Sequence, residues 1–278
     1  MVVVYRDIKA LYNKVDSQGS YVDVDFGTRR VKAEIRNGYI ILGGRYPVDL
    51  KRRLKDNLCY LLKKDGPLPI AFFSSSTNRF YKLIPTRDWP SVAIGSVPMH
   101  RIKGISPKED TENKIKLINP KGMVLDTCMG LGYTAIMASL VSRKVYTFEL
   151  DENIYFIARL NPLSQVLFER DNNIVVRKGD ISRLIRKFKD GFFDCIIHDP
   201  PTFKLAPVLY SQKFYRELQR VLKIGGRFFH YTPLYGIKRG QFFPAKIKKN
   251  LAETGFKIIS FSPDKGGILC QKEARKLR

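Results

Sequence analysis

Residues 124–132, with the sequence VLDTCMGLG, place a short apolar strand directly before a glycine-containing turn, and helical periodicity resumes at about Thr134. Gly130 and Gly132 allow the backbone to turn tightly and to approach a ligand without an intervening Cβ. The amide groups at the start of the following helix would then face that ligand. Structural turns often contain such a glycine pair, and the third glycine of the dinucleotide fingerprint is missing here. The stretch predicts a strand–loop–helix unit and disfavours NAD.

Strands and helices alternate on both sides of this turn, beginning at Ser106-Pro107-Lys108-Glu109, which opens a helix with a capping-box pattern. The expected strands are Val124–Asp126, Lys144–Phe148, Ile174–Arg177, Phe193–Ile197 and Arg227–Tyr231, with a closing pair at Phe256–Phe261 and Ile268–Gln271. This order predicts an α/β fold: a Rossmann-like, seven-stranded, doubly wound sheet over residues 106–278. Ligands of such sheets bind at the carboxyl ends of the strands.

Residues 1–105 predict a smaller N-terminal α+β module. Period-two alternation indicates a strand at 21–26, and Asn37-Gly38 predicts a hairpin between 31–35 and 39–42. Leucines at helical spacing predict a helix over 49–64, and a further strand is expected at 70–73. The segment 74–104 has no clear period and interleaves aromatic with basic residues.

The composition favours a polyanionic partner. The chain has 50 Lys+Arg against 26 Asp+Glu, a formal net charge of +24, and it is 44% hydrophobic, enough for a real core. No apolar run reaches 18 residues and the first ten residues lack a signal-peptide pattern, so we expect a cytoplasmic protein. The four cysteines are far apart, and the three histidines have no metal-ligand spacing, so no metal site is expected.

Three acidic residues, Glu149, Asp180 and Asp199, follow successive expected strands. Glu149, about 20 residues beyond the glycine loop, is placed to accept hydrogen bonds from both ribose hydroxyls, although such a residue is otherwise a solvated loop acid. Asp151 would assist it or cap the next helix. Asp180 would accept from an adenine amino group or cap the helix that starts at Ile181, and both roles are compatible.

The third acid, Asp199, lies in the loop His198-Asp199-Pro200-Pro201-Thr202-Phe203. Two prolines stiffen the loop, so the Asp199 carboxylate and the Pro200 carbonyl would be two fixed acceptors for an exocyclic amino group. Phe203 follows where an aromatic ring would stack on a planar base. A chain reversal and a core phenylalanine are the ordinary alternatives.

As a set, Asp126-x-x-x-Gly130-x-Gly132, Glu149, Asp180 and Asp-Pro-Pro resemble the class I S-adenosylmethionine-dependent methyltransferases. The resemblance implies that the glycine loop holds the methionine part of the cofactor, that Glu149 binds ribose and that Asp180 binds adenine. The cofactor-binding residues it implies are Asp126, Cys128, Gly130, Gly132, Glu149, Asp180 and Asp199.

The Asp-Pro-Pro loop resembles the (Asp/Asn)-Pro-Pro-aromatic loop of amino-group methyltransferases, except that Thr202 precedes the aromatic Phe203. The variant Asp-Pro-Pro-Thr-Phe is similar to that of ribosomal RNA guanine methyltransferases. The segment from Met99 to Thr111 resembles predicted archaeal methyltransferases of unassigned substrate.

Direct in-line transfer is the expected mechanism, with Asp199, Pro200 and Phe203 as catalytic residues. Orientation and electrostatics suffice for it, and no cysteine is placed to act as a nucleophile. A base within a helix would be flipped out onto Phe203. Candidate substrate contacts are Pro201, Thr202, His100 on the link between the halves, and Tyr231 at the end of the fifth strand.

The favoured substrate is an exocyclic amino group of guanine or adenine in rRNA or tRNA. RNA contact is expected from a basic helix (Lys51, Arg52, Arg53, Lys55, Lys63, Lys64) and from aromatic residues Phe80, Tyr81 and Trp89 beside Arg79, Lys82 and Arg87. The alternatives are a protein (glutamine or lysine) N-methyltransferase, a polyamine aminopropyltransferase-like enzyme, and a non-catalytic RNA-binding subunit.

Overall fold

The computed structural model describes residues 1–4, 8, 15, 20–49, 51, 54–232 and 243–274. The chain divides into two compact units, which are described separately. The N-terminal unit comprises residues 1–108 and 153–168, and the sheet unit comprises residues 109–152 and 169–278.

The sheet unit is built on seven strands in the order β14-β13-β12-β15-β16-β18-β17. The strands are β12 (Met123–Asp126), β13 (Lys144–Glu149), β14 (Ile174–Lys178), β15 (Phe193–His198), β16 (Leu222–Tyr231), β17 (Phe256–Ser262) and β18 (Gly267–Lys272). The first five pair in parallel, and β18 pairs antiparallel with both β16 and β17. The predicted Rossmann-like, doubly wound α/β sheet and its antiparallel closing pair are confirmed.

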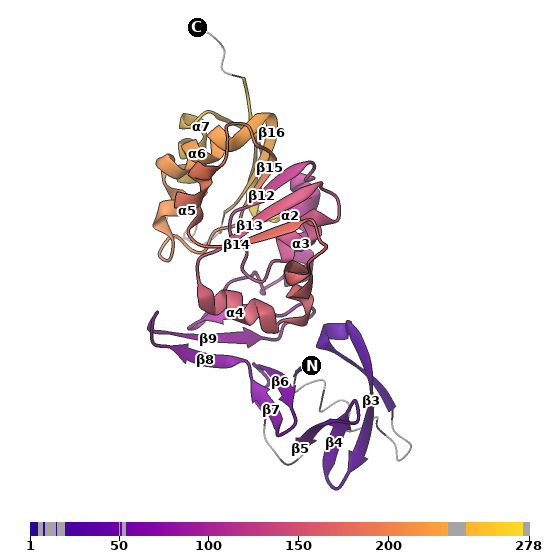
Figure 1. Ribbon diagram of the computed structural model, residues 1–278. Coiled ribbons are helices and arrows are strands. Elements are labelled where there is room, and N and C mark those ends of the chain that lie inside the picture. The colour runs from indigo at the N-terminus through magenta and orange to yellow at the C-terminus, as the bar shows by residue number, and fades with distance from the viewer. Residues whose placement is uncertain are drawn as a thin grey trace. The chain divides into compact units, whose positions relative to one another are not determined.

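Helices lie on both faces of this sheet (Figure 1). They are α2 (Pro107–Ile118), α3 (Tyr133–Ser139), α5 (Ile181–Leu184), α6 (Gln212–Val221) and α7 (Phe243–Glu253). On α6 the buried residues Phe214, Leu218 and Val221 recur at helical spacing and pack into one cluster with Phe193 and Phe228 of the strands. This burial of apolar surface on a rigid sheet fixes the strand ends where the predicted site lies.

The strand order reverses between β12 and β15, which lie side by side with Asp126 opposite Ile197. The two loops that follow them therefore start from the same edge of the sheet. In doubly wound sheets this crevice is where ligands bind.

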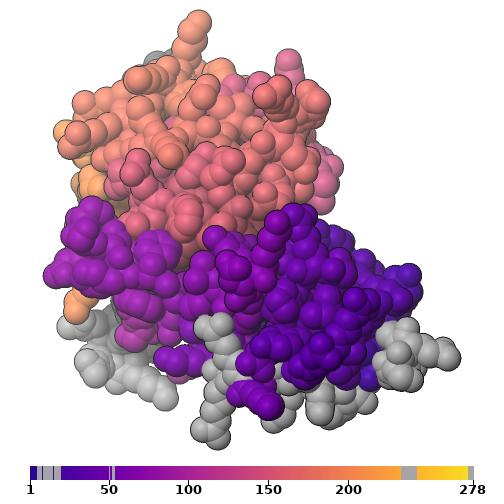
Figure 2. Space-filling model, turned by 60° about the horizontal axis from the view of Figure 1, so that its bottom comes forward, coloured from indigo at the N-terminus to yellow at the C-terminus, as the bar shows by residue number. Residues whose placement is uncertain are grey.

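The described residues of the N-terminal unit form three small antiparallel sheets, with orders β2-β3-β4-β5, β1-β6-β7 and β11-β10-β9-β8. Its strands are β1 (Val2–Val4), β2 (Ser20–Val24), β3 (Arg29–Arg36), β4 (Tyr39–Leu42), β5 (Tyr46–Asp49), β6 (Cys59–Lys63), β7 (Gly66–Pro69), β8 (Ala71–Ser74), β9 (Arg79–Ile84), β10 (Ser91–Ile94) and β11 (Val97–Pro98). The helix α4 (Glu152–Leu160) largely belongs to this unit. The first part of the chain, which contains these strands, is the indigo to purple region of Figure 2.

The predicted hairpin is confirmed, since β3 and β4 pair through Asn37 and Gly38, both with positive φ (49° and 82°). The predicted helix over 49–64 is wrong, because Val2–Val4 pair with 59–61 and draw this segment into a strand. The segment 74–104 is not irregular either, since it forms β9, β10 and β11. Backbone pairing with distant strands outweighed the local leucine spacing.

Within the described part of the chain, no helix combines the length and the apolar character that a membrane crossing requires.

Candidate active site at the strand ends

The glycine loop after β12 is held against the end of β13 by backbone and side-chain hydrogen bonds. Met129 N donates to Phe148 O at 2.7 Å, and Gly130 N donates to Glu149 Oε2 at 2.9 Å. Gly130 has a φ of 55°, and a Cβ built there would meet no atom within 4 Å. The space beside this loop is therefore open to a ligand that approaches the backbone.

Glu149 is fixed by two backbone amides. Its Oε2 accepts from Gly130 N and its Oε1 from Asp151 N, each at 2.9 Å. Burial raises the pKa of Glu149 to about 7, even though these amides favour the charged form. A carboxylate has about four acceptor positions, so two hydroxyl donors of a ribose can still be accommodated.

Asp126 is predicted to contact the cofactor, but the structure buries its side chain. It has no exposed surface, and its oxygens accept from Thr134 Oγ1 at 3.0 Å and Thr147 Oγ1 at 2.5 Å. Burial raises its pKa to about 7, against the opposing effect of the two hydroxyls. A side chain without exposed surface cannot touch a ligand, so Asp126 ties α3 and β13 to the end of β12 from beneath the loop.

Two further predicted residues have clear structural partners. Asp180 caps α5, because its Oδ1 accepts from Ser182 N at 2.9 Å, and its Oδ2 lies 3.5 Å from Arg183 Nε. The Asp180 side chain remains 28% exposed, which leaves room for a second contact. Cys128 is half-buried against the apolar cluster of the sheet unit.

Asp199 of the Asp-Pro-Pro loop forms an ion pair with a lysine of α2 that was not predicted from the sequence. Lys114 Nζ, on α2, donates to Asp199 Oδ2 at 2.6 Å and lies 2.7 Å from Asp110 Oδ2. Lys114 is 5% exposed, whereas Asp199 is 24% exposed. Only Asp199 of these three residues thus presents substantial surface to a substrate.

The rest of the loop is held by residues that follow it. Pro200 is buried, and the Pro201 carbonyl accepts from Tyr210 Oη at 2.8 Å. The Thr202 carbonyl accepts from Leu205 N at 2.8 Å, which closes a turn. Phe203 is 44% exposed and meets the rings of Tyr210 and Phe243 edge-on, at centroid distances of 5.7 and 6.0 Å.

Two buried histidines pair directly behind the loop. His198 and His230 are opposite each other on β15 and β16, with ring centroids 4.7 Å apart. His198 Nε2 donates to Leu209 O, so its Nδ1 accepts from Thr127 Oγ1 at 2.7 Å. His230 has the other tautomer, since Nδ1 donates to Tyr231 O and Nε2 accepts from Tyr215 Oη. Burial lowers the pKa of both rings, that of His230 to about 4.

The last two predicted substrate contacts lie in different units. Tyr231 ends β16, and its ring centroid is 4.7 Å from Lys114 Nζ. His100 belongs to the N-terminal unit, where its Nδ1 lies 2.9 Å from Ser91 Oγ. The sheet unit thus brings together the glycine loop, Glu149, Asp199 and Tyr231, while His100 remains a predicted contact.

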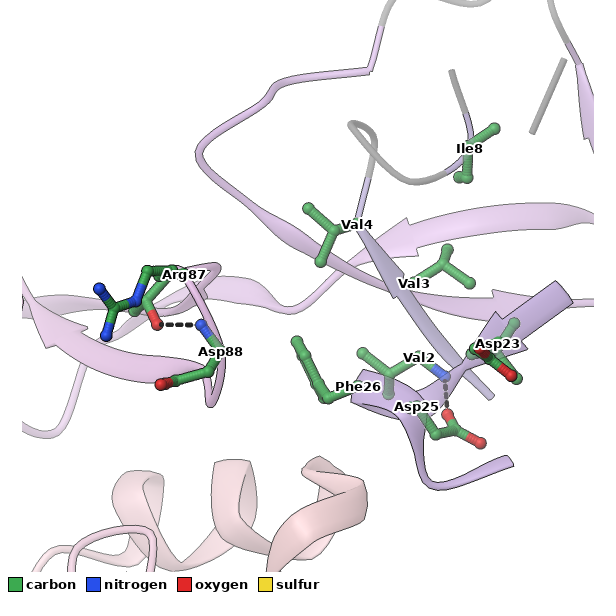
Figure 3. Close-up of a pocket in the computed structure, with 12 residues that line it drawn as sticks. Val2, Val3, Val4, Ile8, Asp23, Asp25, Phe26, Arg87 and Asp88 are labelled. Atoms are coloured by element: carbon green, nitrogen blue, oxygen red, sulfur yellow. Dashed lines mark hydrogen bonds between the residues drawn. The ribbon is translucent and has the colours of Figure 1, made fainter. Parts of the chain in front are cut away.

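The N-terminal unit has a cavity of its own, of about 290 Å³ (Figure 3). Val2 and Val4 of β1 line it together with the carboxylates of Asp23, Asp25 and Asp88. Asp25 is already engaged, because its Oδ1 accepts from Val2 N at 2.5 Å and its Oδ2 lies 3.0 Å from Arg29 Nε. Arg87 also lines the cavity, so its lining carries both signs of charge, and none of these residues belongs to the strand-end site.

The strand-end residues fit an S-adenosylmethionine-type cofactor. The open side of Gly130 accommodates a group that packs on the backbone, and Glu149 has remaining acceptor positions for a ribose diol. Asp199 lies across the sheet reversal from them, after the neighbouring strand. The arrangement provides a cofactor end and an acceptor end on adjacent strands.

Comparisons with known proteins relate the chain to a methyltransferase domain family and to one archaeal protein. Residues 125–230 match the model of a methyltransferase domain family. The chain is 42% identical over 226 residues to the uncharacterized protein MJ1233 of Methanocaldococcus jannaschii, covering 80% of this chain and 77% of that protein.

Solved structures agree on the fold alone. The spermidine synthase of Thermotoga maritima superimposes with a TM-score of 0.53 at 18% identity, covering 74% of this chain and 75% of that chain. A probable spermidine synthase of Corynebacterium glutamicum gives 0.51 at 16% identity, covering 73% and 79%. Together with the strand order and the glycine loop, the sequence matches show that the chain belongs to the family of MJ1233 and carries a class I S-adenosylmethionine-dependent methyltransferase domain.

Proposed function

We propose that the protein transfers a methyl group from S-adenosylmethionine to an exocyclic amino group of a base in RNA. The observation that carries the proposal is the partly exposed Asp199 carboxylate, held in a proline-stiffened loop on the strand beside the glycine loop. An amine needs acceptors for its hydrogens so that its lone pair faces the methyl group. Asp199 and the Pro200 carbonyl would be those acceptors.

The cofactor would be held by residues at the ends of β12, β13 and β14. Glu149 would accept from the ribose hydroxyls, Asp180 from the adenine amino group, and the methionine part would lie along the backbone at Gly130. When bound, S-adenosylmethionine supplies an electrophilic methyl group on a sulfonium. Asp199 then stabilises the positive charge that grows on the acceptor nitrogen, and no strong base is required.

Phe203 would provide the stacking surface for the base. Its ring is 44% exposed, while contacts with Tyr210 and Phe243 fix its orientation. Because Phe203 follows Asp199 by four residues in a turn closed by Thr202, stacking and amine recognition come from one loop. A planar base suits this pair better than a flexible protein side chain.

An exposed aromatic pair supports RNA as the larger substrate. Phe73 and Phe80 are opposite each other on β8 and β9 and are 60% and 43% exposed. Lys82 shares their face of the sheet, and the exposed Arg79 directly precedes Phe80 in the strand. Aromatic faces beside cations are typical of single-strand binding, and the net charge of +24 favours a polyanion. Of the aromatic residues predicted to contact RNA, Tyr81 is fully buried and is therefore excluded. Of the basic residues predicted to contact RNA, Arg52 and Arg53 lie outside the described residues.

The test is transfer of tritium from labelled S-adenosylmethionine into total RNA from a strain that lacks this gene. The wild type should label RNA, and nucleoside digestion would then identify the modified base. Asp199→Ala should not label RNA, whereas Asp171→Ala, which changes an exposed aspartate of the same unit, should behave as wild type. No label in RNA, with cofactor binding intact, would overturn the proposal and turn the search to ribosomal proteins and polyamines.

A further inference from the structure

Lys114 is a buried lysine that contacts two carboxylates at the acceptor end of the site. Its Nζ lies 2.6 Å from Asp199 Oδ2, 2.7 Å from Asp110 Oδ2 and 4.7 Å from the centroid of the Tyr231 ring. Burial by itself would lower the pKa of Lys114, but the charges of Asp199 and Asp110 raise it above its ordinary value. The lysine is therefore a permanent cation in a nearly water-free position.

The three charges do not cancel. Two carboxylates and one ammonium give these three side chains together one net negative charge. Asp110 and Lys114 are buried, with 2% and 5% of their side-chain surface exposed. Asp199 is the solvent-facing member of the cluster, at 24% exposure. The excess negative charge is therefore presented on the side of Asp199.

Stability alone is a poor reason for this cluster. A buried ion pair rarely adds stability compared with well-packed apolar residues, because both charges must leave water. Yet the inward face of α2 presents Asp110, Thr111 and Lys114 to the interior, together with the apolar Ile118. The polar part of this face meets the Asp-Pro-Pro loop through Lys114.

We propose that Lys114 and Asp110 are positioning residues for Asp199: Lys114 fixes the orientation and charge of its carboxylate, and Asp110 neutralises the lysine so that the acceptor nitrogen faces a net negative charge. This inference rests on the proposed function. Transfer forms a nitrogen–carbon bond while the carbon–sulfur bond breaks with its electron pair on sulfur. The positive charge passes to nitrogen, which then releases a proton to water. A lysine without Asp110 would oppose that charge.

Other titratable groups near Asp199 come from neighbouring elements. Asp126 at the end of β12 and Cys128 in the glycine loop both interact electrostatically with Asp199, and Tyr231 of β16 lies against Lys114. All of them stay unchanged in the variants below. Differences between the variants therefore report the cluster of Asp110, Lys114 and Asp199.

The test compares Lys114→Met, Asp110→Asn and the double variant in the full-length protein, with methyl transfer to RNA as the assay. Asp110→Asn should lower kcat about tenfold with little change in KM for the cofactor, because the remaining pair is neutral. Lys114→Met leaves two adjacent carboxylates, so the pH at which kcat is half-maximal should rise by about one unit or more. The double variant keeps the single charge of Asp199 and should recover most of the kcat lost in both single variants.

Two further variants separate this role from a merely structural one. Lys114→Arg keeps the charge and should restore the wild-type pH profile, and Lys116→Met, on the exposed side of the same helix, should match wild type. Losses of kcat that follow thermal stability alone, an unshifted pH profile in Lys114→Met, or a double variant no better than the single variants would overturn the inference.

Failure of the proposed function is recognised separately, because wild type itself would then label no RNA. In that case the carboxyl carbons of ¹³C-aspartate-labelled protein are titrated by NMR, and the Asp199 signal is assigned by its loss in Asp199→Asn. Its midpoint should rise in Lys114→Met and return in Lys114→Arg. An unchanged midpoint would overturn the inference whatever the substrate.

Discussion

The two ends of the candidate site hold their carboxylates by opposite means. At the cofactor end, Glu149 and Asp126 accept only from neutral donors in the contacts described: backbone amides for Glu149 and threonine hydroxyls for Asp126. At the acceptor end, Asp199 is paired with a buried cation. Burial raises the pKa of Glu149 and Asp126 to about 7, so both are close to their titration point in neutral solution.

This difference matches the chemistry expected at each end. Ribose hydroxyls donate to an oxygen acceptor and need little charge, so uncharged donors are sufficient to orient Glu149. A developing ammonium needs a full negative charge that does not take up a proton, and a nearby cation keeps Asp199 in that state. The following predictions, from the largest expected effect to the smallest, test this division.

Asp199→Asn should reduce kcat for RNA methylation by about 10²–10³-fold, because it removes the charge opposite the acceptor nitrogen. The dissociation constant for S-adenosylhomocysteine, measured by calorimetry, should change little. An equal loss of cofactor affinity would instead place Asp199 at the cofactor end, as the family resemblance also implied.

Glu149→Gln should weaken S-adenosylhomocysteine binding by about 10–100-fold, because it removes a charged acceptor and turns an amide donor toward a backbone N–H. Wild-type affinity should rise between pH 6 and 8, since ribose donors favour the ionised carboxylate, and the variant should lose this rise. Glu152→Gln, an exposed glutamate three residues away, is the control. Wild-type affinity independent of pH would contradict this assignment.

Asp126→Asn should change how stability depends on pH. Burial raises the folded pKa above the ordinary value of 3.8 to about 7, so its contribution is fully present below about pH 4 and is lost as the pH rises through 7. Asparagine has no such loss. Relative to wild type, the variant should therefore gain on the order of 2 kcal/mol between pH 5 and pH 8, measured by chemical unfolding. A constant difference would mean that Asp126 is ionised throughout.

Phe73→Ser should weaken RNA binding about fivefold, the low end expected for loss of one stacked base, and leave cofactor affinity unchanged. Filter binding at fixed salt concentration measures the effect. Phe72→Ser is an unsuitable control because Phe72 packs on Tyr81 and Phe156, whereas Leu68→Ser, also exposed, is suitable. Equal losses in Phe73→Ser and Leu68→Ser would remove the case for stacking.

The sheet unit could be predicted closely from the sequence because its parallel strands contain short apolar runs that alternate with helical patterns along the chain. The N-terminal unit could not, since its small sheets depend on pairing between distant segments. The leucines of 49–64 have helical spacing, yet Tyr60 and Leu62 are buried in a strand beside β1. Nothing local in that segment reveals its partner.

Lys114 is a residue of the site whose partners, likewise, could not be predicted from the local sequence. Asp110 and Lys114 are four residues apart, which on most helices is a solvent-exposed ion pair. The structure instead buries both, together with Thr111 and Ile118, on one helical stripe. A usable signal was the position of that stripe: residues 107, 110, 111, 114 and 118 follow helical spacing, although three of them are polar.

The ion pair between Lys114 and Asp199 also has a consequence for the order of folding. It joins residues 85 positions apart, and the intervening chain contains four of the five parallel strands. Closing so long a loop costs entropy before the contact gains anything, and an unpaired lysine in a dry interior is strongly unfavourable. We therefore expect α2 to dock late in folding, with the last parallel strands, so that the acceptor end of the site forms after the cofactor end.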